Sequence, residues 1–280
     1  MQKILTHVLG VTAIGGTTAA YYFNKLKQDD ICSTADCRPH RAPTPSSDID
    51  VSHREMSPWL DNWDFRHPSS LPDNATEKEK KVPTATRHVI LVRHGQYVHS
   101  KDGPQFKVLT ELGIEQAKKT GERIAALNIN FDNLIISTMV RATQTGKIIG
   151  ESLPDVPQQM CSLLEEGSPY PVVPSRADLE TFEWKLLTFS DHPRIESAFR
   201  KYIRRADPDQ EKDSYDLLVC HGNVIRYFVC RALQFPPEGW LRMSVANCGI
   251  TWISIRPTGR VSLRGLGDVG HLPSDMITYN

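Results

Sequence analysis

The sequence lacks an excess of charge of either sign. Its 280 residues hold 33 lysines and arginines against 33 aspartates and glutamates. Because no net field favours nucleic acid or an acidic surface, we predict no nucleic-acid partner. The sequence also lacks an internal repeat and a cluster of carboxylates for a divalent ion. We therefore predict no metal and no cofactor.

Cysteine is scarce as well. Six cysteines in a chain of this length do not form a disulfide framework. Cys32 and Cys37 lie close together, but no second pair with metal-binding spacing accompanies them. We interpret them as ordinary thiols and expect a reducing compartment.

Charge is also missing from the start of the chain, where residues 4–23 contain no Asp, Glu, Lys or Arg. At about 1.5 Å per residue, such a helix just spans a hydrocarbon core of about 30 Å. We interpret residues 1–24 as a membrane anchor, although the segment is rich in Gly, Ala and Thr and contains His7. A cleaved secretory signal and an organellar presequence are the alternatives.

Residues 25–86 are rich in proline and poor in aliphatic side chains. Such a segment buries too little apolar area to fold alone, so we predict a flexible linker. Residues 57–66 stand out in it, because Trp59 and Trp63 are two of only five tryptophans in the chain. Large rigid side chains favour binding pockets. We predict that this segment docks on another subunit, with packing on its own domain as the alternative.

From residue 87 onward, short β-rich runs alternate with segments of helical periodicity. We predict strands at 89–92, 134–137 and 217–220, helices at 110–127, 141–151 and 224–235, an amphipathic segment at 193–206, and a hairpin at 249–265. Residues 154–192 hold several prolines and give no clear pattern. The alternation predicts an α/β fold, a three-layer αβα sandwich with a mostly parallel central sheet, over residues 87–280.

Two of the predicted strands end in a histidine. Arg93-His94-Gly95 follows one apolar run, and His221-Gly222 follows another. Ligands of open α/β sheets collect at the carboxyl ends of the strands. We predict that His94 attacks phosphorus and forms a phosphohistidine, which divides one difficult displacement into two easier ones. We expect His221 to donate hydrogen bonds to the same phosphoryl group.

The remaining chemistry needs fixed positive charge and a proton carrier. Arg93 adjoins the predicted nucleophile, and Arg141 follows a third strand near a helix start. The planar guanidinium group of arginine binds two phosphate oxygens at once. Glu165 and Glu166 lie side by side on a predicted loop. A carboxyl with a raised pKa could give a proton to the leaving group and later take one from water, and we expect one of these two to do so.

These residues lie within a recognisable series of motifs. Residues 91–95, 109–117, 137–145 and 220–226 resemble the successive motifs of the histidine phosphatase (phosphoglycerate mutase-like) superfamily. The resemblance covers residues 87–280 and implies a phosphoglycerate mutase-like fold. It implies that His94 is the nucleophile and that Arg93, Arg141 and His221 form the phosphate pocket. It also favours Glu166 over Glu165, because residues 163–167 fit the superfamily's Leu-Leu-Arg-Glu-Gly pattern.

A more specific resemblance is carried by residues 213–215, 223–227, 230–242 and 255–257, which are similar to mitochondrial serine/threonine-protein phosphatases of this superfamily. It implies phosphoprotein substrates and a single-pass N-terminal anchor in a mitochondrial membrane, the outer membrane being favoured over the inner. Residues 59–64 resemble the multimerisation motif of these proteins, with Leu60 in place of its first Asp. The resemblance implies homo-oligomers that form, and are activated, through Trp59, Asn62, Trp63 and Asp64.

Three other functions fit the same residues. They are a small-molecule phosphomonoesterase, a phosphoglycerate mutase, and an interaction protein that acts as a scaffold. A mutase must retain its phosphate in a deep and strongly basic pocket, and the main candidate lid, residues 154–192, is not rich in lysine. We therefore favour hydrolysis over mutase chemistry, and the resemblance implies that the substrates are phosphoproteins.

Overall fold

The computed structural model describes residues 59–68, 72, 74–76, 80–100, 102–175, 177–179 and 181–279. The chain divides into two units, residues 1–60 and 61–280. Only residues 59 and 60 of the first unit are described, so the predicted anchor lies outside the described residues. Within the described ranges, no helix combines the length and the apolar composition needed to cross a membrane.

A six-stranded sheet forms the centre of the second unit, in the order β3-β2-β4-β1-β5-β6. Its strands are β1 (Arg87–Arg93), β2 (Asn133–Ser137), β3 (Gln158–Cys161), β4 (Ser214–Cys220), β5 (Ile250–Ile255) and β6 (Val261–Asp268). The strands β3, β2, β4 and β1 are parallel to one another. At one side of the sheet, β5 pairs antiparallel with β1, and β6 pairs antiparallel with β5. This confirms the predicted, mostly parallel sheet.

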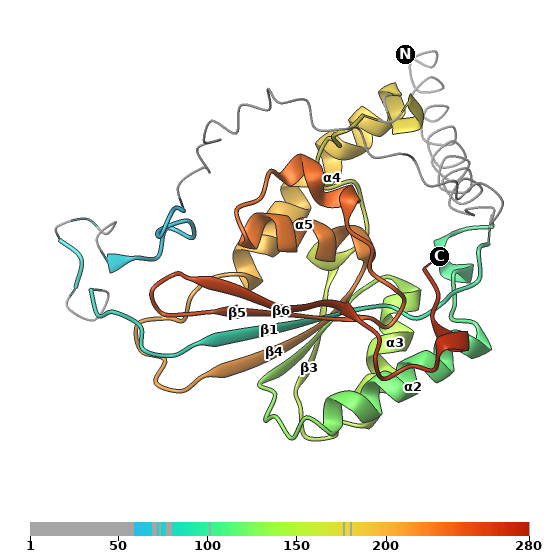
Figure 1. Ribbon diagram of the computed structural model, residues 1–280, viewed down its shortest axis with the longest axis horizontal. Helices are drawn as coiled ribbons and strands as arrows, with labels where there is room; N and C mark the ends of the chain where they lie inside the picture. The colour runs from blue at the N-terminus through green and yellow to red at the C-terminus, as the bar shows by residue number, and fades with distance from the viewer. Residues whose placement is uncertain are drawn as a thin grey trace, which may run out of the picture. The chain divides into compact units, whose positions relative to one another are not determined.

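Helices cover both faces of the sheet (Figure 1). The described part of the chain holds the α-helices α2 (Glu111–Ala125), α3 (Val140–Glu151), α4 (Phe182–Tyr202) and α5 (Gly222–Ala232). Short 3₁₀ turns occupy Pro104–Phe106, Ser162–Leu164, Ala177–Leu179, Pro237–Arg242 and Ser274–Met276. Figure 1 shows α2 and α3 on one face and α4 and α5 on the other, which confirms the αβα sandwich.

The side chains of β1 divide the core between these two faces. Ile90 and Val92 pack in a cluster with residues of α2 and α3, whereas Val89 and Leu91 pack with residues of α4 and α5. This division follows from the two-residue period of a strand. Because both faces are covered, β1 reads as a continuous apolar run rather than an alternating one.

Two predicted helices differ from the structure. The amphipathic segment expected to begin at Pro193 is the second half of α4, which begins at Phe182 and is capped by Thr181, whose hydroxyl accepts a hydrogen bond from the Trp184 amide. Proline is disfavoured inside a helix, so the pattern indicated a boundary where none exists. The helix expected to run from residue 224 to residue 235 ends at Ala232, because the chain turns through Gln234 at a φ of 55°.

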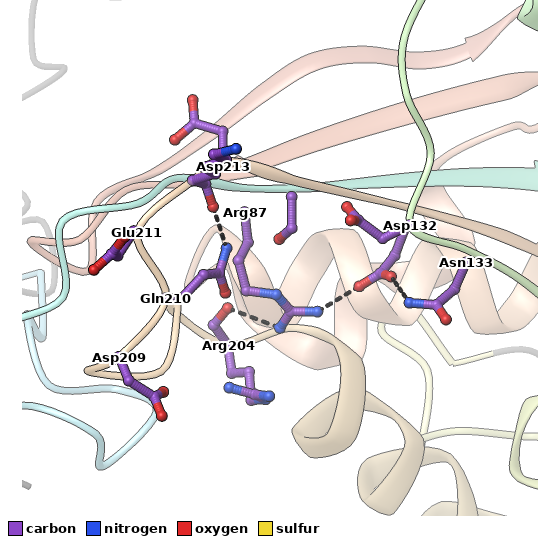
Figure 2. A pocket seen from close by; sticks show the side chains of 11 residues that line it. Arg87, Asp132, Asn133, Arg204, Asp209, Gln210, Glu211 and Asp213 are labelled. Carbon is purple, nitrogen blue, oxygen red and sulfur yellow. Dashed lines mark hydrogen bonds and ion pairs between the residues drawn. The ribbon is translucent and has the colours of Figure 1, made fainter. Parts of the chain in front are cut away.

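The amino ends of β1 and β4 border a polar pocket of about 570 Å³ (Figure 2). Arg87 pairs there with Asp216 at 2.6 Å and donates to the Tyr202 carbonyl at 3.1 Å. Asn133 donates to the other oxygen of Asp216 at 2.8 Å. These groups satisfy one another's charges and hydrogen bonds, so we assign them a structural role at this end of the sheet.

The described part of the tryptophan segment packs on its own chain. Asp64 pairs with Arg205 at 2.8 Å, and the two side chains are 3% and 0% exposed. The Trp63 indole donates to the Gly259 carbonyl at 2.8 Å, and its ring centroid lies 6.0 Å from that of Phe199. Gly259 has a φ of 86° and leaves no room for a Cβ beside the backbone of this segment. These contacts hold residues 61–64 on their own domain.

Candidate active site

The two histidines of the site are brought together by strand pairing. β1 and β4 are parallel neighbours, and Arg93 lies opposite Cys220. The next residue of each strand is therefore a histidine at the same edge of the sheet. The ring centroids of His94 and His221 lie 5.1 Å apart, and both residues are buried.

The hydrogen bonds of His94 fix its tautomer. Its Nδ1 lies 2.8 Å from the Gly95 carbonyl oxygen, which can only accept, so Nδ1 carries the proton. Its Nε2 accepts a hydrogen bond from Arg141 Nε at 3.0 Å. Burial, with the nearby positive charge of Arg141, holds the pKa of His94 well below its ordinary value. His94 is thus a neutral imidazole whose Nε2 lone pair points at the Arg141 guanidinium.

His221 is the residue before the first turn of α5 and is fully buried. Its Nε2 lies 2.8 Å from the Ser137 hydroxyl. Its Nδ1 is buried and has no hydrogen-bond partner among the residues described. Burial, followed by the charges of Arg141 and Arg93, lowers the pKa of His221 well below its ordinary value. A buried polar nitrogen without a partner marks a place where a ligand atom would be satisfied.

Arg93 lies beside both histidines, since its charge contributes to lowering the pKa of each. Its guanidinium donates to the carbonyls of Val245 at 2.7 Å and Tyr279 at 2.9 Å, whereas its Nε is buried without a partner in the described structure. Burial lowers the pKa of Arg93 to about 10, so the side chain remains a cation at neutral pH.

Of the two adjacent glutamates, Glu166 lies near the positive charges of Arg141 and Arg93. Burial raises the pKa of Glu166, and the charges of Arg141 and Arg93 oppose that rise. The Glu165 carboxylate instead accepts a hydrogen bond from the Thr138 hydroxyl. Arg194 holds the backbone between them by donating to the Glu165 carbonyl at 2.6 Å and the Glu166 carbonyl at 3.2 Å. The geometry therefore favours Glu166 as the proton carrier.

The structure brings together the five residues that the sequence assigned to the chemistry, namely Arg93, His94, Arg141, Glu166 and His221. Trp63 and Asp64 lie elsewhere, because their partners Gly259 and Arg205 are on loops at the other end of β1. In the same segment, Asn62 accepts a hydrogen bond from the His67 amide at 2.9 Å, and Trp59 is 37% exposed.

Sequence reasoning missed several residues that line or support the site. The Tyr97 ring meets His94 edge-on at 5.2 Å and lies 4.8 Å from the Arg141 guanidinium. Asn247 is fully buried and donates to the His94 carbonyl at 3.0 Å. Ser137 lies in the motif at residues 137–145, but the sequence assigns its side chain no role.

The chain matches a known protein family. The model of the histidine phosphatase superfamily, branch 1, matches residues 89–170 and 188–267. The chain belongs to the histidine phosphatase superfamily. This confirms the resemblance drawn from the motifs, and the chain is therefore an enzyme, a phosphatase of this superfamily.

Relatives of this histidine phosphatase share much of its sequence. The serine/threonine-protein phosphatase Pgam5, mitochondrial, of Caenorhabditis briggsae is 51% identical over 81% of this chain and 83% of that protein. Its namesake in Xenopus laevis is 45% identical, with 82% and 87% covered. The Drosophila virilis protein of that name is 43% identical, with 100% and 96% covered. A solved phosphoglycerate mutase from Plasmodium falciparum is 35% identical over 70% of this chain and 99% of that chain, with a TM-score of 0.49.

The neutral His94 of this phosphatase makes its stability depend on pH. In the unfolded chain a histidine takes up a proton near pH 6.5, whereas folded His94 stays neutral because its pKa is lowered. The unfolded state therefore binds more protons below pH 6.5, and stability falls as the pH falls. We expect His94→Gln to reduce that slope by up to about 1.4 kcal/mol per pH unit. Urea denaturation at pH 5.5, 6.5 and 7.5 measures it, and parallel stability curves for the two proteins would contradict the assignment.

Proposed function

We propose that this histidine phosphatase hydrolyses phosphoserine and phosphothreonine in proteins through a phosphohistidine at His94. The observation that carries the proposal is the His94 ring, whose Nδ1 is committed to the Gly95 carbonyl while Nε2 meets Arg141 at 3.0 Å. Such an imidazole is a nucleophile aimed at a phosphate-binding group. The names of the relatives supply the substrate class, since each is called a serine/threonine-protein phosphatase.

The proposed reaction has two displacements at phosphorus. In the first, His94 Nε2 forms a bond to phosphorus, the bond from phosphorus to the serine or threonine oxygen breaks, and Glu166 protonates that oxygen. In the second, Glu166 takes a proton from water, the water oxygen bonds to phosphorus, and the phosphorus–nitrogen bond breaks. Inorganic phosphate leaves, and His94 is neutral again. Arg93, Arg141 and His221 stabilise the phosphoryl oxygens in both steps.

We also propose a place and an assembly for the enzyme. The uncharged residues 4–23 would anchor it in a mitochondrial membrane, the outer membrane being favoured, and the relatives' names support the organelle. The tryptophan segment would join copies of the chain into an active homo-oligomer. Trp63 and Asp64 hold the segment on its domain, and the Arg200 guanidinium lies 5.5 Å from the ring centroid of Phe65, which follows them and is 70% exposed.

The function is tested by comparing substrates and trapping the intermediate. We expect the full-length protein to release phosphate from a phosphothreonine peptide, and His94→Ala to lower that rate by about four orders of magnitude or more, with an unchanged circular dichroism spectrum. A rapidly quenched ³²P turnover should label the protein in an acid-labile, alkali-stable form. Preference for 3-phosphoglycerate would indicate the mutase or small-molecule phosphatase, and an inactive wild type would indicate a scaffold.

The proton carrier is tested by the leaving group. A phosphoserine oxygen needs a proton as it leaves, whereas the phenolate of p-nitrophenyl phosphate does not. Because kcat/KM reports formation of the phosphohistidine and not its hydrolysis, we expect Glu166→Gln to lower kcat/KM about 100-fold for a phosphoserine peptide and much less for p-nitrophenyl phosphate. Glu165→Gln is the matched control, because its carboxylate bonds Thr138 instead. Equal losses on both substrates for Glu166→Gln, or the larger selective loss for Glu165→Gln, would refute the assignment.

The assembly is tested by removing the Trp63 ring. We expect Trp63→Ala to shift the protein from a large assembly toward dimers and to lower its phosphatase rate, because the indole contact with Gly259 that holds the segment is lost. Sedimentation velocity gives the mass. Phe189→Ala is the control, since it removes an aromatic ring that is 81% exposed on α4, outside the segment. A Trp63→Ala protein of unchanged mass would count against assembly through this segment.

A further inference from the structure

Ser137 and His221 form a buried pair behind the proposed phosphate site. Ser137 is the last residue of β2, its exposed fraction is 0%, and its Oγ lies 2.8 Å from His221 Nε2. We propose that Ser137 sets the tautomer of His221, so that Nδ1 carries the ring proton and donates a hydrogen bond to the phosphoryl group. Ser137 would then be a positioning residue for the reaction, an inference that rests on the proposed function.

The hydrogens of the pair can be placed by counting partners. A fully buried hydroxyl proton requires an acceptor. The Met139 amide approaches Ser137 Oγ at 3.5 Å as a donor, so it cannot accept that proton. Among the described residues, His221 Nε2 is the acceptor within reach. If Nε2 accepts, the single proton of the neutral ring lies on Nδ1.

The opposite tautomer satisfies fewer groups. If His221 Nε2 carried the proton and donated it to Ser137, the serine proton would be buried without an acceptor in the described structure. The ring would then present an unshared electron pair from Nδ1 toward any bound anion, where it repels rather than binds. In the first tautomer, only the Nδ1 proton of the pair lacks a hydrogen-bond acceptor, and a phosphoryl oxygen of the substrate would accept that bond.

The surroundings of Ser137 hold this arrangement in place. The Thr143 hydroxyl donates to the Ser137 carbonyl at 3.1 Å, which fixes the turn from β2 into α3. Arg141 lies in the first turn of that helix and contacts His94. The same turn therefore places one phosphate ligand directly and orients a second, His221, through Ser137. Burial, followed by the charges of Arg141 and Arg93, lowers the pKa of His221, so the ring carries one proton and Ser137 can set which nitrogen holds it.

Nuclear magnetic resonance determines the tautomer of His221 directly, without an activity assay. We expect magic-angle-spinning spectra of the full-length protein, with ¹⁵N in the histidine rings, to show His221 protonated at Nδ1. The His221→Ala variant identifies its signals by their loss. In Ser137→Ala, the His221 signals should move toward protonation at Nε2. A wild-type His221 protonated at Nε2, or signals unchanged in Ser137→Ala, would overturn the proposal.

Kinetics test the consequence for phosphate transfer. We expect Ser137→Ala to lower kcat about tenfold on a phosphothreonine peptide, less than His221→Ala does, since the loss of one such donor costs about 100-fold or more. Because Ser137 acts through His221, Ser137→Ala should have no further effect in the His221→Ala background. Additive losses in the double variant would contradict this.

A second buried serine–histidine pair supplies the control. Ser254 Oγ lies 2.9 Å from His88 Nδ1 on the same sheet, away from the site, and both residues are buried. Ser254→Ala should leave kcat and the His221 signals unchanged, whereas equal losses in the two serine variants would indicate a general loss of packing. An inactive wild type whose His221 is protonated at Nδ1 would overturn the proposed function but keep the tautomer assignment.

Discussion

The hydrogen bond from Arg141 Nε to His94 Nε2 is the contact on which the proposed chemistry depends. A guanidinium cannot donate to a protonated nitrogen, so the contact requires a neutral imidazole with its proton on Nδ1. The Gly95 carbonyl provides for that proton, and burial beside positive charge keeps a second one away. The cation that would bind the phosphoryl group thus also keeps the nucleophile ready to receive it.

The register of the sheet positions the residues that form and surround this contact. The parallel register of β1 and β4 sets His94 beside His221, and β2 feeds the turn that carries Arg141. The carbonyls of Val245 and Tyr279 hold Arg93 from the other side, so the last residues of the chain also help to form the site. At the other end of the same strands, Arg87 and Asp216 neutralise each other. The amino ends of these strands are therefore stabilised by an ion pair, whereas their carboxyl ends position the residues of the proposed active site.

The sequence predicted the sheet, most helices and the main site residues, because these leave strong local patterns: apolar runs, helical periodicity, and histidines directly after strands. It missed β3, because this edge strand has only four residues, begins with two glutamines and is mostly exposed, which is typical of a loop. It misplaced the start of α4, because packing and the Thr181 cap outweigh the cost of Pro193. It placed Ser137 in a motif but could not reveal a role for its side chain, because that role depends on His221, 84 residues away.

A structure of the enzyme with orthovanadate would test phosphoryl transfer to His94, because vanadate copies the geometry of phosphorus during displacement. We expect vanadium bonded to His94 Nε2, with its oxygens in contact with Arg93, Arg141 and His221 Nδ1, and with Glu166 facing the apical oxygen. Vanadate bound away from His94, or bound there with His221 Nδ1 turned away from its oxygens, would contradict it.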